Sequence, residues 1–176
     1  VTRSLVFVLA FIGFGSKAGL VPLHVWLPRA HPEAPSYVSA LMSAAMVNLG
    51  VYGVLRVGFD LLGGGPRWWW LLALGVGVLS ALYGVLQAMA STDFKRLLAY
   101  STTENLGLIF IGVGAAGTFA ATGQRTLAGL LMLAALLHTV NHAAFKTLLF
   151  LGAGAVLRST HLRDLDAMGG LARRMP

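Results

Sequence analysis

Residues 138–146 read HTVNHAAFK and lie inside an apolar run that covers positions 126–150. A run of this length can cross a bilayer as a helix, which needs about 20 predominantly apolar residues. His138, His142 and Lys146 follow one another at intervals of four, so they share one face of that helix. At a rise of about 1.5 Å per residue the row covers ~12 Å, over a third of a ~30 Å hydrocarbon core.

This row of protonatable side chains at membrane depth has two interpretations. In the first it is a proton relay, because groups that lose and regain a proton can pass it along the row. In the second it holds helices together through hydrogen bonds and transports nothing. Ionisable residues inside a membrane are costly and usually face the interior of a bundle, so we favour the relay. Asn141, within the same stretch, is a possible accessory residue.

The composition is that of an integral membrane protein. Of the 176 residues, 57% are hydrophobic and only 11% are charged, and the mean hydropathy is +0.77. A soluble domain carries about 25% charged residues, so this chain has too little polar surface to cover a water-facing globule. We therefore expect an all-α fold embedded in a lipid bilayer.

Cysteine content and charge narrow the possible functions. The sequence has no cysteine, which excludes a cysteine-ligated iron–sulfur cluster and a thiolate nucleophile from this chain. We expect no metal or cofactor site, and any associated electron transfer has to take place in another subunit. The net charge of +7 does not indicate nucleic acid binding, because basic and aromatic residues do not interleave on a polar surface.

Apolar runs separated by charged, proline-rich or glycine-rich turns predict five transmembrane helices. The expected helices cover residues 4–27, 35–56, 68–91, 96–117 and 125–156, and a cytoplasmic tail covers 159–176. Pro22 interrupts the first helix, because a proline cannot donate the usual backbone hydrogen bond. The run Trp68-Trp69-Trp70 predicts an aromatic belt at the level of the lipid headgroups.

Lys17 is a second candidate for ion transport. Apolar residues lie on both sides of it, which argues against the alternative that its ammonium group reaches the membrane surface. Pro22 frees the carbonyl of Ala18, and discontinuous helices of this kind line ion pathways. We therefore expect Lys17 to be buried beside a helix break. His24 returns to the same face if the helix resumes beyond the break.

The next stretch, residues 28–35, reads PRAHPEAP. Its prolines predict a turn-forming linker and not a helix. We expect His31 and Glu33 to be interfacial loop residues and not metal ligands.

Two further polar residues occur inside predicted helices. Asn48 is the one strongly polar interior residue of its helix, and it needs a hydrogen-bond partner in a neighbouring helix or in ordered water. Glu104 lies about two turns into helix 96–117. It is either a carboxylate of an ion path or an interfacial residue held by local hydrogen bonds, and both interpretations are kept.

Basic residues are distributed unevenly between the two ends of the predicted bundle. One end carries the larger set: Arg29, Lys95, Arg96, Arg158, Arg163, Arg173 and Arg174. The other end carries the smaller set: Arg3, Arg56, Arg67 and Arg125. The positive-inside rule places the larger set in the cytoplasm. We expect a multi-pass protein of the cell inner membrane with a periplasmic N-terminus and a cytoplasmic C-terminus.

Four motifs in order resemble one family. They are KAGLVPLHVWLP at 17–28, VSALM at 38–42, DFKRLLAYST at 93–102 and the stretch at 138–146. Together they resemble the antiporter-like proton-translocating subunits shared by respiratory complex I, Mrp cation/proton antiporters and membrane-bound hydrogenases. The wording HVWLPRAHPEAP at 24–35 looks most like component B of hydrogenase-4 and formate hydrogenlyase complexes.

The resemblance implies a larger bundle built on two inverted five-helix repeats, with ion sites near the midplane. It implies that this chain, which starts at Val1 and not at a methionine, is a fragment covering about helices seven to eleven. Lys17 then matches the lysine of the broken seventh helix, which accepts and releases the transported proton. His138 and His142 match relay positions on the eleventh helix, and Lys146 matches a lysine there.

The sequence departs from the family pattern in three respects. The fifth-helix glutamate that partners the seventh-helix lysine lies outside this chain, and Glu104 does not occupy its position. The twelfth-helix residue on the way out of the membrane is also absent. Asn48 stands where hydrogenase-type relatives tend to carry a lysine. An asparagine cannot gain or lose a proton near neutral pH, so a proton transfer there would need water.

The resemblance implies a proton-translocating subunit of a redox-driven complex of the hydrogenase-4, formate hydrogenlyase or complex I type. Its partners would be the other membrane subunits of a respiratory or hydrogenase complex. One alternative is a cation/proton antiporter subunit of the Mrp type, driven by an ion gradient alone. Another is a structural membrane anchor that moves no ion. A self-contained enzyme is disfavoured, because nothing pairs a nucleophile with a base in a water-accessible pocket.

Overall fold

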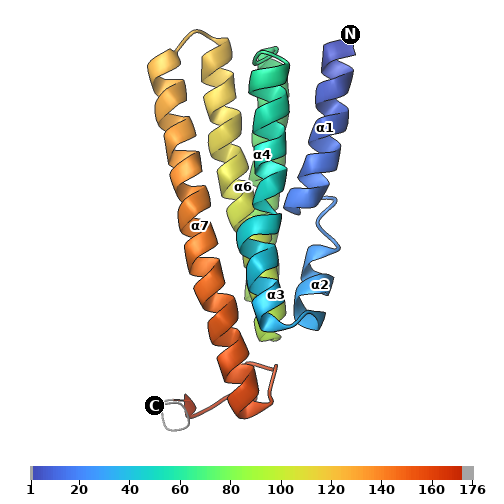
Figure 1. The fold of residues 1–176 in the computed structure, drawn as a ribbon, viewed down its shortest axis with the longest axis vertical. Helices are drawn as coiled ribbons and strands as arrows, with labels where there is room; N and C mark the ends of the chain where they lie inside the picture. The colour runs from blue at the N-terminus through green and yellow to red at the C-terminus, as the bar shows by residue number, and fades with distance from the viewer. Residues whose placement is uncertain (1, 172–176) are drawn as a thin grey trace.

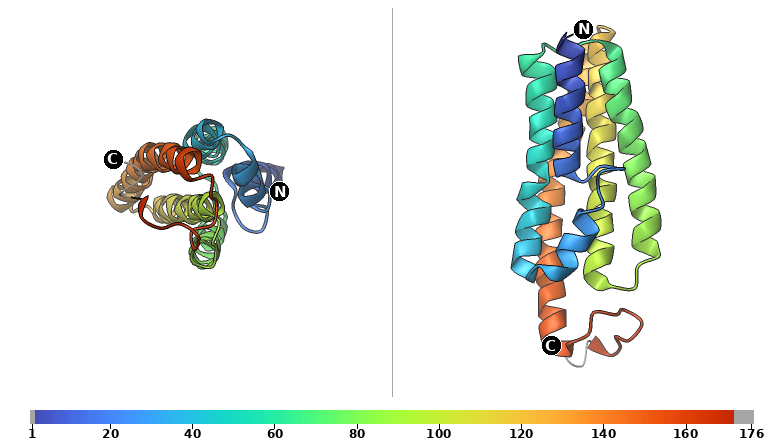
Figure 2. Two further views of the ribbon diagram at one scale, coloured as in Figure 1. Left: turned by 90° about the horizontal axis from the view of Figure 1, so that it is seen from below. Right: turned by 90° about the vertical axis from the view of Figure 1, so that its right-hand side faces the viewer.

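The computed structural model describes residues 2–171, which form an elongated bundle of helices (Figure 1). The elements in order are α1 (Thr2–Ala18), α2 (Leu27–Glu33), α3 (Ser36–Leu41), the π-helix η1 (Met42–Met46), α4 (Asn48–Leu55), the π-helix η2 (Arg56–Leu61), α5 (Arg67–Met89), α6 (Phe94–Ala121) and α7 (Arg125–Thr160). The start of α1 and the end of α7 lie at opposite ends of the bundle (Figures 1 and 2). The end that contains α2 and the end of α7 is called the lower end below.

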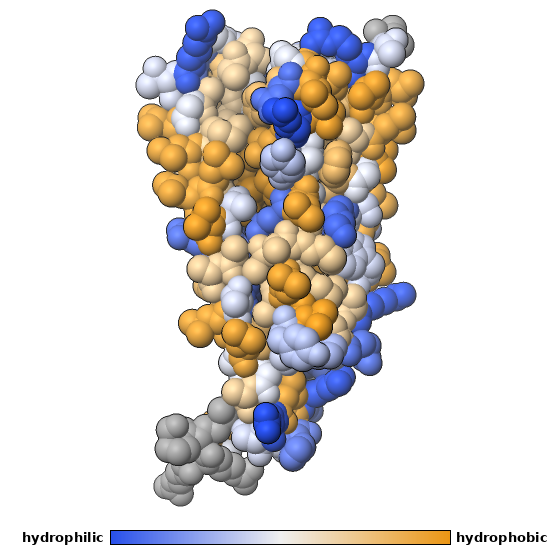
Figure 3. Space-filling model, in the orientation of Figure 1, coloured by the Kyte–Doolittle hydropathy of each residue, from blue (hydrophilic) through white to orange (hydrophobic). Residues whose placement is uncertain are grey.

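Four helices in the described part of the chain are long and apolar enough to cross a membrane: Ser36–Leu61, Arg67–Met89, Phe94–Ala121 and Arg125–Thr160. The first of them is the continuous rod formed by α3, η1, α4 and η2. Hydrophobic side chains spread over the flank of the bundle shown in Figure 3. An exposed apolar flank of this kind suits hydrocarbon and not water. The all-α membrane class predicted from the sequence is therefore confirmed, with four long helices where five were expected.

The remaining predicted helix, residues 4–27, is broken. Helix α1 stops at Ala18, Gly19 follows with a φ of +78°, and turns continue until α2 begins at Leu27. A positive φ is favourable for glycine because it has no Cβ, so Gly19 is suited to ending the helix. The interruption expected near Pro22 is confirmed.

Hydrogen bonds join the turns between α1 and α2 to helix α5 and to the end of α1. The backbone N–H of Val21 donates a hydrogen bond to Ser80 Oγ on α5, at 3.0 Å. The indole Nε1 of Trp26 donates to the carbonyl oxygen of Ser16 on α1, at 2.8 Å. The first bond satisfies the N–H of Val21, which the broken helix leaves without an intrahelical acceptor. The second adds a donor to the Ser16 carbonyl, which also accepts the backbone N–H of Gly19 at 3.1 Å.

The prediction that residues 28–35 form a linker without a helix is wrong, because α2 occupies most of this stretch. Pro28 lies in the first turn of α2, where a helix needs no N–H donor. Pro32 removes only the bond to the carbonyl four residues earlier, and the backbone N–H of Ala34 still closes the last turn on Ala30.

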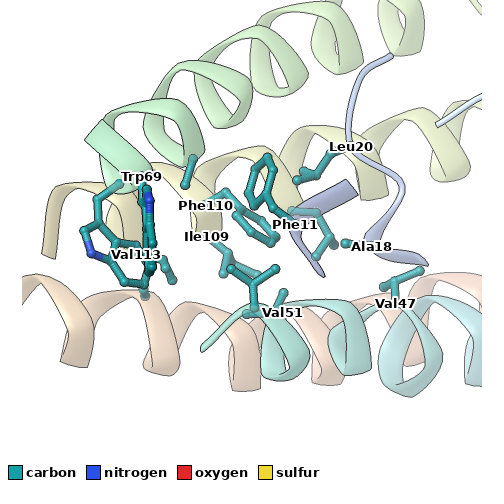
Figure 4. Packing of buried hydrophobic residues seen from close by; sticks show 14 of the residues in the cluster. Phe11, Ala18, Leu20, Val47, Val51, Trp69, Ile109, Phe110 and Val113 are labelled. Atoms are coloured by element: carbon teal, nitrogen blue, oxygen red, sulfur yellow. The ribbon is translucent and has the colours of Figure 1, made fainter. Parts of the chain in front are cut away.

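Aromatic rings form much of the main hydrophobic core, which joins α1, α4, α5 and α6 (Figure 4). The Phe7 ring stacks on Trp69 with centroids 4.4 Å apart, and Trp70 stacks on Phe59 at 4.0 Å. Both indole N–H groups find acceptors within the bundle, which allows the rings to be buried. The predicted aromatic belt is therefore wrong for Trp69 and Trp70; Trp68 is the exposed member of the run.

The segment after α7 turns back beneath the loop between α5 and α6. An isolated antiparallel bridge joins Asp93 to Asp164, with a backbone hydrogen bond on either side of it. Arg163 forms an ion pair with Glu33 at the end of α2, at 3.7 Å. This part of the predicted tail therefore connects three elements at the lower end of the bundle.

Candidate functional site

The three side chains that the sequence places in a row differ in burial. His142 and Lys146 have 0% exposure, whereas His138 is half-buried. Helix α6 and the α3–η1 rod pack against α7, and the structure places His142 and Lys146 inside this junction. Asn141 is exposed on the outside of α7.

Lys146 is bound to the backbone of α6. Its Nζ donates a hydrogen bond to the carbonyl oxygen of Leu98 at 2.9 Å. The same carbonyl accepts a bond from Thr102 Oγ1 at 3.0 Å, and this hydroxyl shares a 2.8 Å hydrogen bond with Ser43 Oγ on η1. Half-buried Glu104 lies close enough to attract the Lys146 ammonium electrostatically. Among the described residues no carboxylate forms an ion pair with Lys146, so its charge is held at a high desolvation cost.

His142 and His138 follow Lys146 along α7, toward the start of the helix. Both ring nitrogens of His142 are buried and have no hydrogen-bond partner in the described part of the chain. Lys146 and His138, one turn away on either side, lie close enough to act electrostatically on His142. His138 Nε2 is 3.1 Å from Asn105 Oδ1, so Nε2 carries the hydrogen in this contact. The amide of Asn105 in turn donates to the carbonyl of Ser101 at 2.8 Å.

His31 is a buried residue of this region that the sequence interpretation missed. Its ring stacks on Phe150 of α7 with centroids 4.8 Å apart, and both ring nitrogens lack a partner within residues 2–171. It lies close enough to Lys146 and Lys95 to interact with the charge of each. The prolines of residues 28–35 led to the prediction of an interfacial linker, in which a histidine would be solvated. The stretch instead forms the short helix α2, and one face of this helix, which includes His31, is buried.

Lys95 is also buried, with 4% exposure, although the sequence assigns it to the basic membrane surface. Its Nζ donates to the carbonyl oxygen of Ala34, which follows α2, at 2.5 Å. Lys95, His31, Lys146 and His142 therefore form a set of buried protonatable groups shared by α2, α6 and α7. This set, called the buried basic row below, begins in the first turn of α6 at the lower end and continues along α7.

The expectation that Lys17 is buried is not met within the described residues. Its side chain is exposed and lines an apolar pocket together with Leu49 of α4. Helix α1 packs into the bundle through Phe7, Phe11 and Ala18. At ~100° per residue, helical spacing places Lys17 about 80° around α1 from Phe7 and about 120° from Phe11. The packing of these residues therefore leaves the lysine on the flank of the helix, where it is exposed.

His24 does not share a face with Lys17, because helix geometry does not resume until α2. It lies in the turns before α2 with 7% exposure. Its ring packs edge-on against Tyr83 of α5, with centroids 4.6 Å apart. Because the helix is broken, the two predicted site residues have different neighbours: Lys17 lies beside α4, and His24 packs against α5.

Asn48 begins α4, separated by one residue from the end of the π-helical turn η1. It is half-buried, and its Nδ2 donates to the carbonyl oxygen of Ala44 at 2.7 Å. Its Oδ1 is buried and has no partner in the described residues. The described residues therefore give Asn48 a local backbone acceptor and no partner in a neighbouring helix, and the alternative of an ordered water stays a prediction. The residue lies beside a π-turn of the kind that is frequent at functional sites.

Comparison with known proteins identifies the family to which the chain is similar. The whole chain, residues 1–176, matches the family described as NADH:quinone oxidoreductase/Mrp antiporter, transmembrane. An uncharacterised protein of Mycobacterium tuberculosis is 67% identical over 174 residues, which cover 99% of this chain and 27% of that protein. Hydrogenase-4 component B of Escherichia coli is 54% identical over 175 residues, which cover 98% of this chain and 26% of that protein.

A solved structure also shares the fold. The structure of the Mrp complex from Dietzia sp. matches with a TM-score of 0.79 and 25% identity, covering 97% of this chain and 30% of the matched chain. The chain therefore spans about a quarter of the length of these relatives (27% and 26% of the two proteins). The resemblance to antiporter-like membrane subunits is confirmed. Because the family match covers its full length, the chain belongs to the NADH:quinone oxidoreductase/Mrp antiporter transmembrane family.

Proposed function

We propose that this chain is part of a proton-translocating subunit of a redox-driven membrane complex of the hydrogenase-4 or formate hydrogenlyase type. The observation that carries the proposal is the burial of Lys146 and His142, one turn apart and without an ion pair within the described residues. Such groups are costly in a purely structural role. The 54% identity to hydrogenase-4 component B supports a redox-driven partner.

In the proposed mechanism the proton moves along the buried basic row. Lys146 releases a proton toward His142, whose unpartnered nitrogens can accept it, and His138 with Asn105 continues the route along α7. Coulombic interactions are strong in a weakly screened interior. A charge that moves near Lys146 therefore changes how tightly this amine holds its proton, which couples transport to events elsewhere in the complex.

At the lower end, His31 and Lys95 are proposed to connect Lys146 with the aqueous face. His31 lies near both lysines, and Lys95 lies in the first turn of α6. We expect His31→Gln to slow proton translocation by at least about tenfold, because positioned proton-transfer groups contribute 10²–10⁴-fold in catalysis. The matched control is His161→Gln, which changes an exposed histidine at the end of α7. Equal rates in both variants, measured with a pH dye in vesicles, would remove His31 from the route.

Lys17 is proposed to work with a partner outside this chain. Its exposed side chain on the outer face of α1 sits beside apolar residues, as expected if other helices of the full-length protein cover that face. By the family resemblance one of those helices carries the glutamate that pairs with the seventh-helix lysine. The other membrane subunits of the complex are the proposed partners of the whole protein.

We further propose that α1 and α2 together form a fifth crossing, and that the lower end faces the cytoplasm. Lys95 is buried and cannot serve as a surface charge. Arg173 and Arg174 lie outside the described residues. Four exposed arginines then remain at the lower end (Arg29, Arg96, Arg158 and Arg163), and the opposite end also carries four (Arg3, Arg56, Arg67 and Arg125). The proposed orientation therefore rests on the count over the whole sequence, to which Arg173 and Arg174 contribute.

A second candidate is a cation/proton antiporter driven by an ion gradient, which the fold similarity to the Mrp complex supports. The deciding experiment places the full-length protein with its partner subunits in sealed vesicles that contain a pH dye. A pH change that requires the electron donor of the redox partner supports the first proposal. A pH change driven by an imposed Na⁺ gradient alone supports the second. Vesicles that respond to neither, although the complex is assembled, indicate a structural anchor.

A further inference from the structure

A polar pocket of about 380 Å³ lies at the lower end of the bundle, between α2, α5 and α6. Its chemistry comes from Arg29, Arg96, Tyr83, Tyr100 and His24. The two arginines are exposed, whereas His24 is buried and its Nδ1 has no partner in the described part of the chain. None of these residues belongs to the buried basic row, so the proposed proton route leaves the pocket unexplained.

The side chains of this pocket suit an anion that bears a phosphate. Two guanidinium groups can donate several charge-assisted hydrogen bonds, and the tyrosine hydroxyls and the imidazole can add others. No carboxylate lines the pocket among the described residues. The nearby Asp93 accepts the backbone N–H of Arg96, at 2.8 Å, and not its guanidinium.

An apolar groove of about 240 Å³ lies farther from the lower end. The groove and the polar pocket both lie where the chain from α1 to α2 runs beside α5, and this line of contact is called the seam below. It is lined by loop residues 20–23, by α1, and by Leu72 and Val76 of α5. The loop residues directly precede His24, and Val76 lies about 10 Å from Tyr83 along α5, at ~1.5 Å per residue. The polar pocket and the apolar groove therefore share one side of the molecule, where the loop between α1 and α2 approaches α5 (Figure 2, right).

We propose that this seam binds one anionic phospholipid, with its phosphate between Arg29 and Arg96 and an acyl chain in the groove beside Leu72 and Val76. A phospholipid carries a phosphate and a hydrocarbon chain, which can reach the polar pocket and the apolar groove about 10 Å farther along α5 at the same time. A free phosphate would fill only the pocket. Basic pockets between helices at the cytoplasmic side bind lipid headgroups, and tyrosines concentrate at the membrane interface. Both properties agree with a site at the ends of α5 and α6.

The test measures the affinity of the purified full-length protein for short-chain phosphatidylglycerol and phosphatidylcholine by native mass spectrometry. The double variant Arg29→Gln/Arg96→Gln is expected to bind phosphatidylglycerol about thirtyfold more weakly, at roughly 1 kcal/mol for each arginine. The matched control Arg67→Gln/Arg125→Gln removes two exposed arginines from the opposite end of the bundle and is expected to bind like the unmodified protein. Unchanged binding in the first variant, or equal affinity for the two lipids, overturns the proposal.

A second experiment tests whether the ligand of this seam is a lipid or a free phosphate. Val76→Phe narrows the groove and is expected to weaken phosphatidylglycerol binding without changing the arginines; Leu72→Phe, at an exposed position, repeats the test with less risk to folding. Competition with inorganic phosphate is expected to be weak, because it lacks the acyl chain. If phosphate displaces the lipid fully and both groove variants bind normally, the pocket is a free-phosphate site and the lipid assignment fails. Proton translocation does not enter this test, so its outcome is independent of the proposed function.

Discussion

Lys146→Met is expected to abolish proton translocation by the full-length subunit while its complex still assembles. Methionine fills a similar volume with an apolar chain, and it removes a buried charge that has no ion pair within the described residues. The carbonyl of Leu98 keeps its hydrogen bond from Thr102, so no new unpaired acceptor is left. Vesicle acidification with a pH dye measures transport, and native gel electrophoresis measures assembly.

Lys146→Arg separates loss of charge from loss of proton exchange. Arginine keeps the positive charge but does not release its proton in proteins, so we expect transport to be lost here as well. The control is Arg158→Gln, a charge removal on the same helix outside the buried basic row, which is expected to leave transport unchanged. Normal acidification with either Lys146 variant would show that this lysine does not carry the proton.

Lys17→Met is expected to abolish translocation with little change in stability. The side chain is exposed within the described residues and lies beside apolar residues of α1 and α4, so a methionine at this position disturbs no packing there. Transport is lost if the ammonium exchanges protons with a carboxylate on another helix of the full-length protein. The melting temperature of the detergent-purified protein is measured beside the transport rate.

The alternative for Lys17 is a lysine that simply contacts lipid headgroups. In that case Lys17→Met would leave the transport rate at its original value, because the lysine would take no part in proton transfer and an exposed single charge contributes little to stability. That result would contradict the proposed partner outside the chain. It would leave the role of Lys146 intact, since Lys146 is buried against α6 through contacts that Lys17 does not share.

The aromatic run and the proline-rich stretch show how local patterns can mislead about burial. Tryptophans at a helix start are typical of a headgroup belt, yet Trp69 and Trp70 face the core because Phe7 and Phe59 provide stacking partners. Prolines typically predict a linker, yet α2 forms and places His31 against Phe150. In both cases a partner distant in sequence decides the outcome, and no local pattern reports such a partner.

The sequence by itself determined that this is an all-α membrane protein, that its first segment is broken near Pro22, and that His138, His142 and Lys146 share a face. These properties follow from hydropathy, from the missing proline donor and from helical periodicity, which all act within a few turns. Only the tertiary structure decided which face of each helix meets a neighbour. It left Lys17 exposed and brought His31 of α2 near both Lys95 of α6 and Lys146 of α7. Periodicity states which residues lie together on a helix, but the direction that they face depends on how the helices pack.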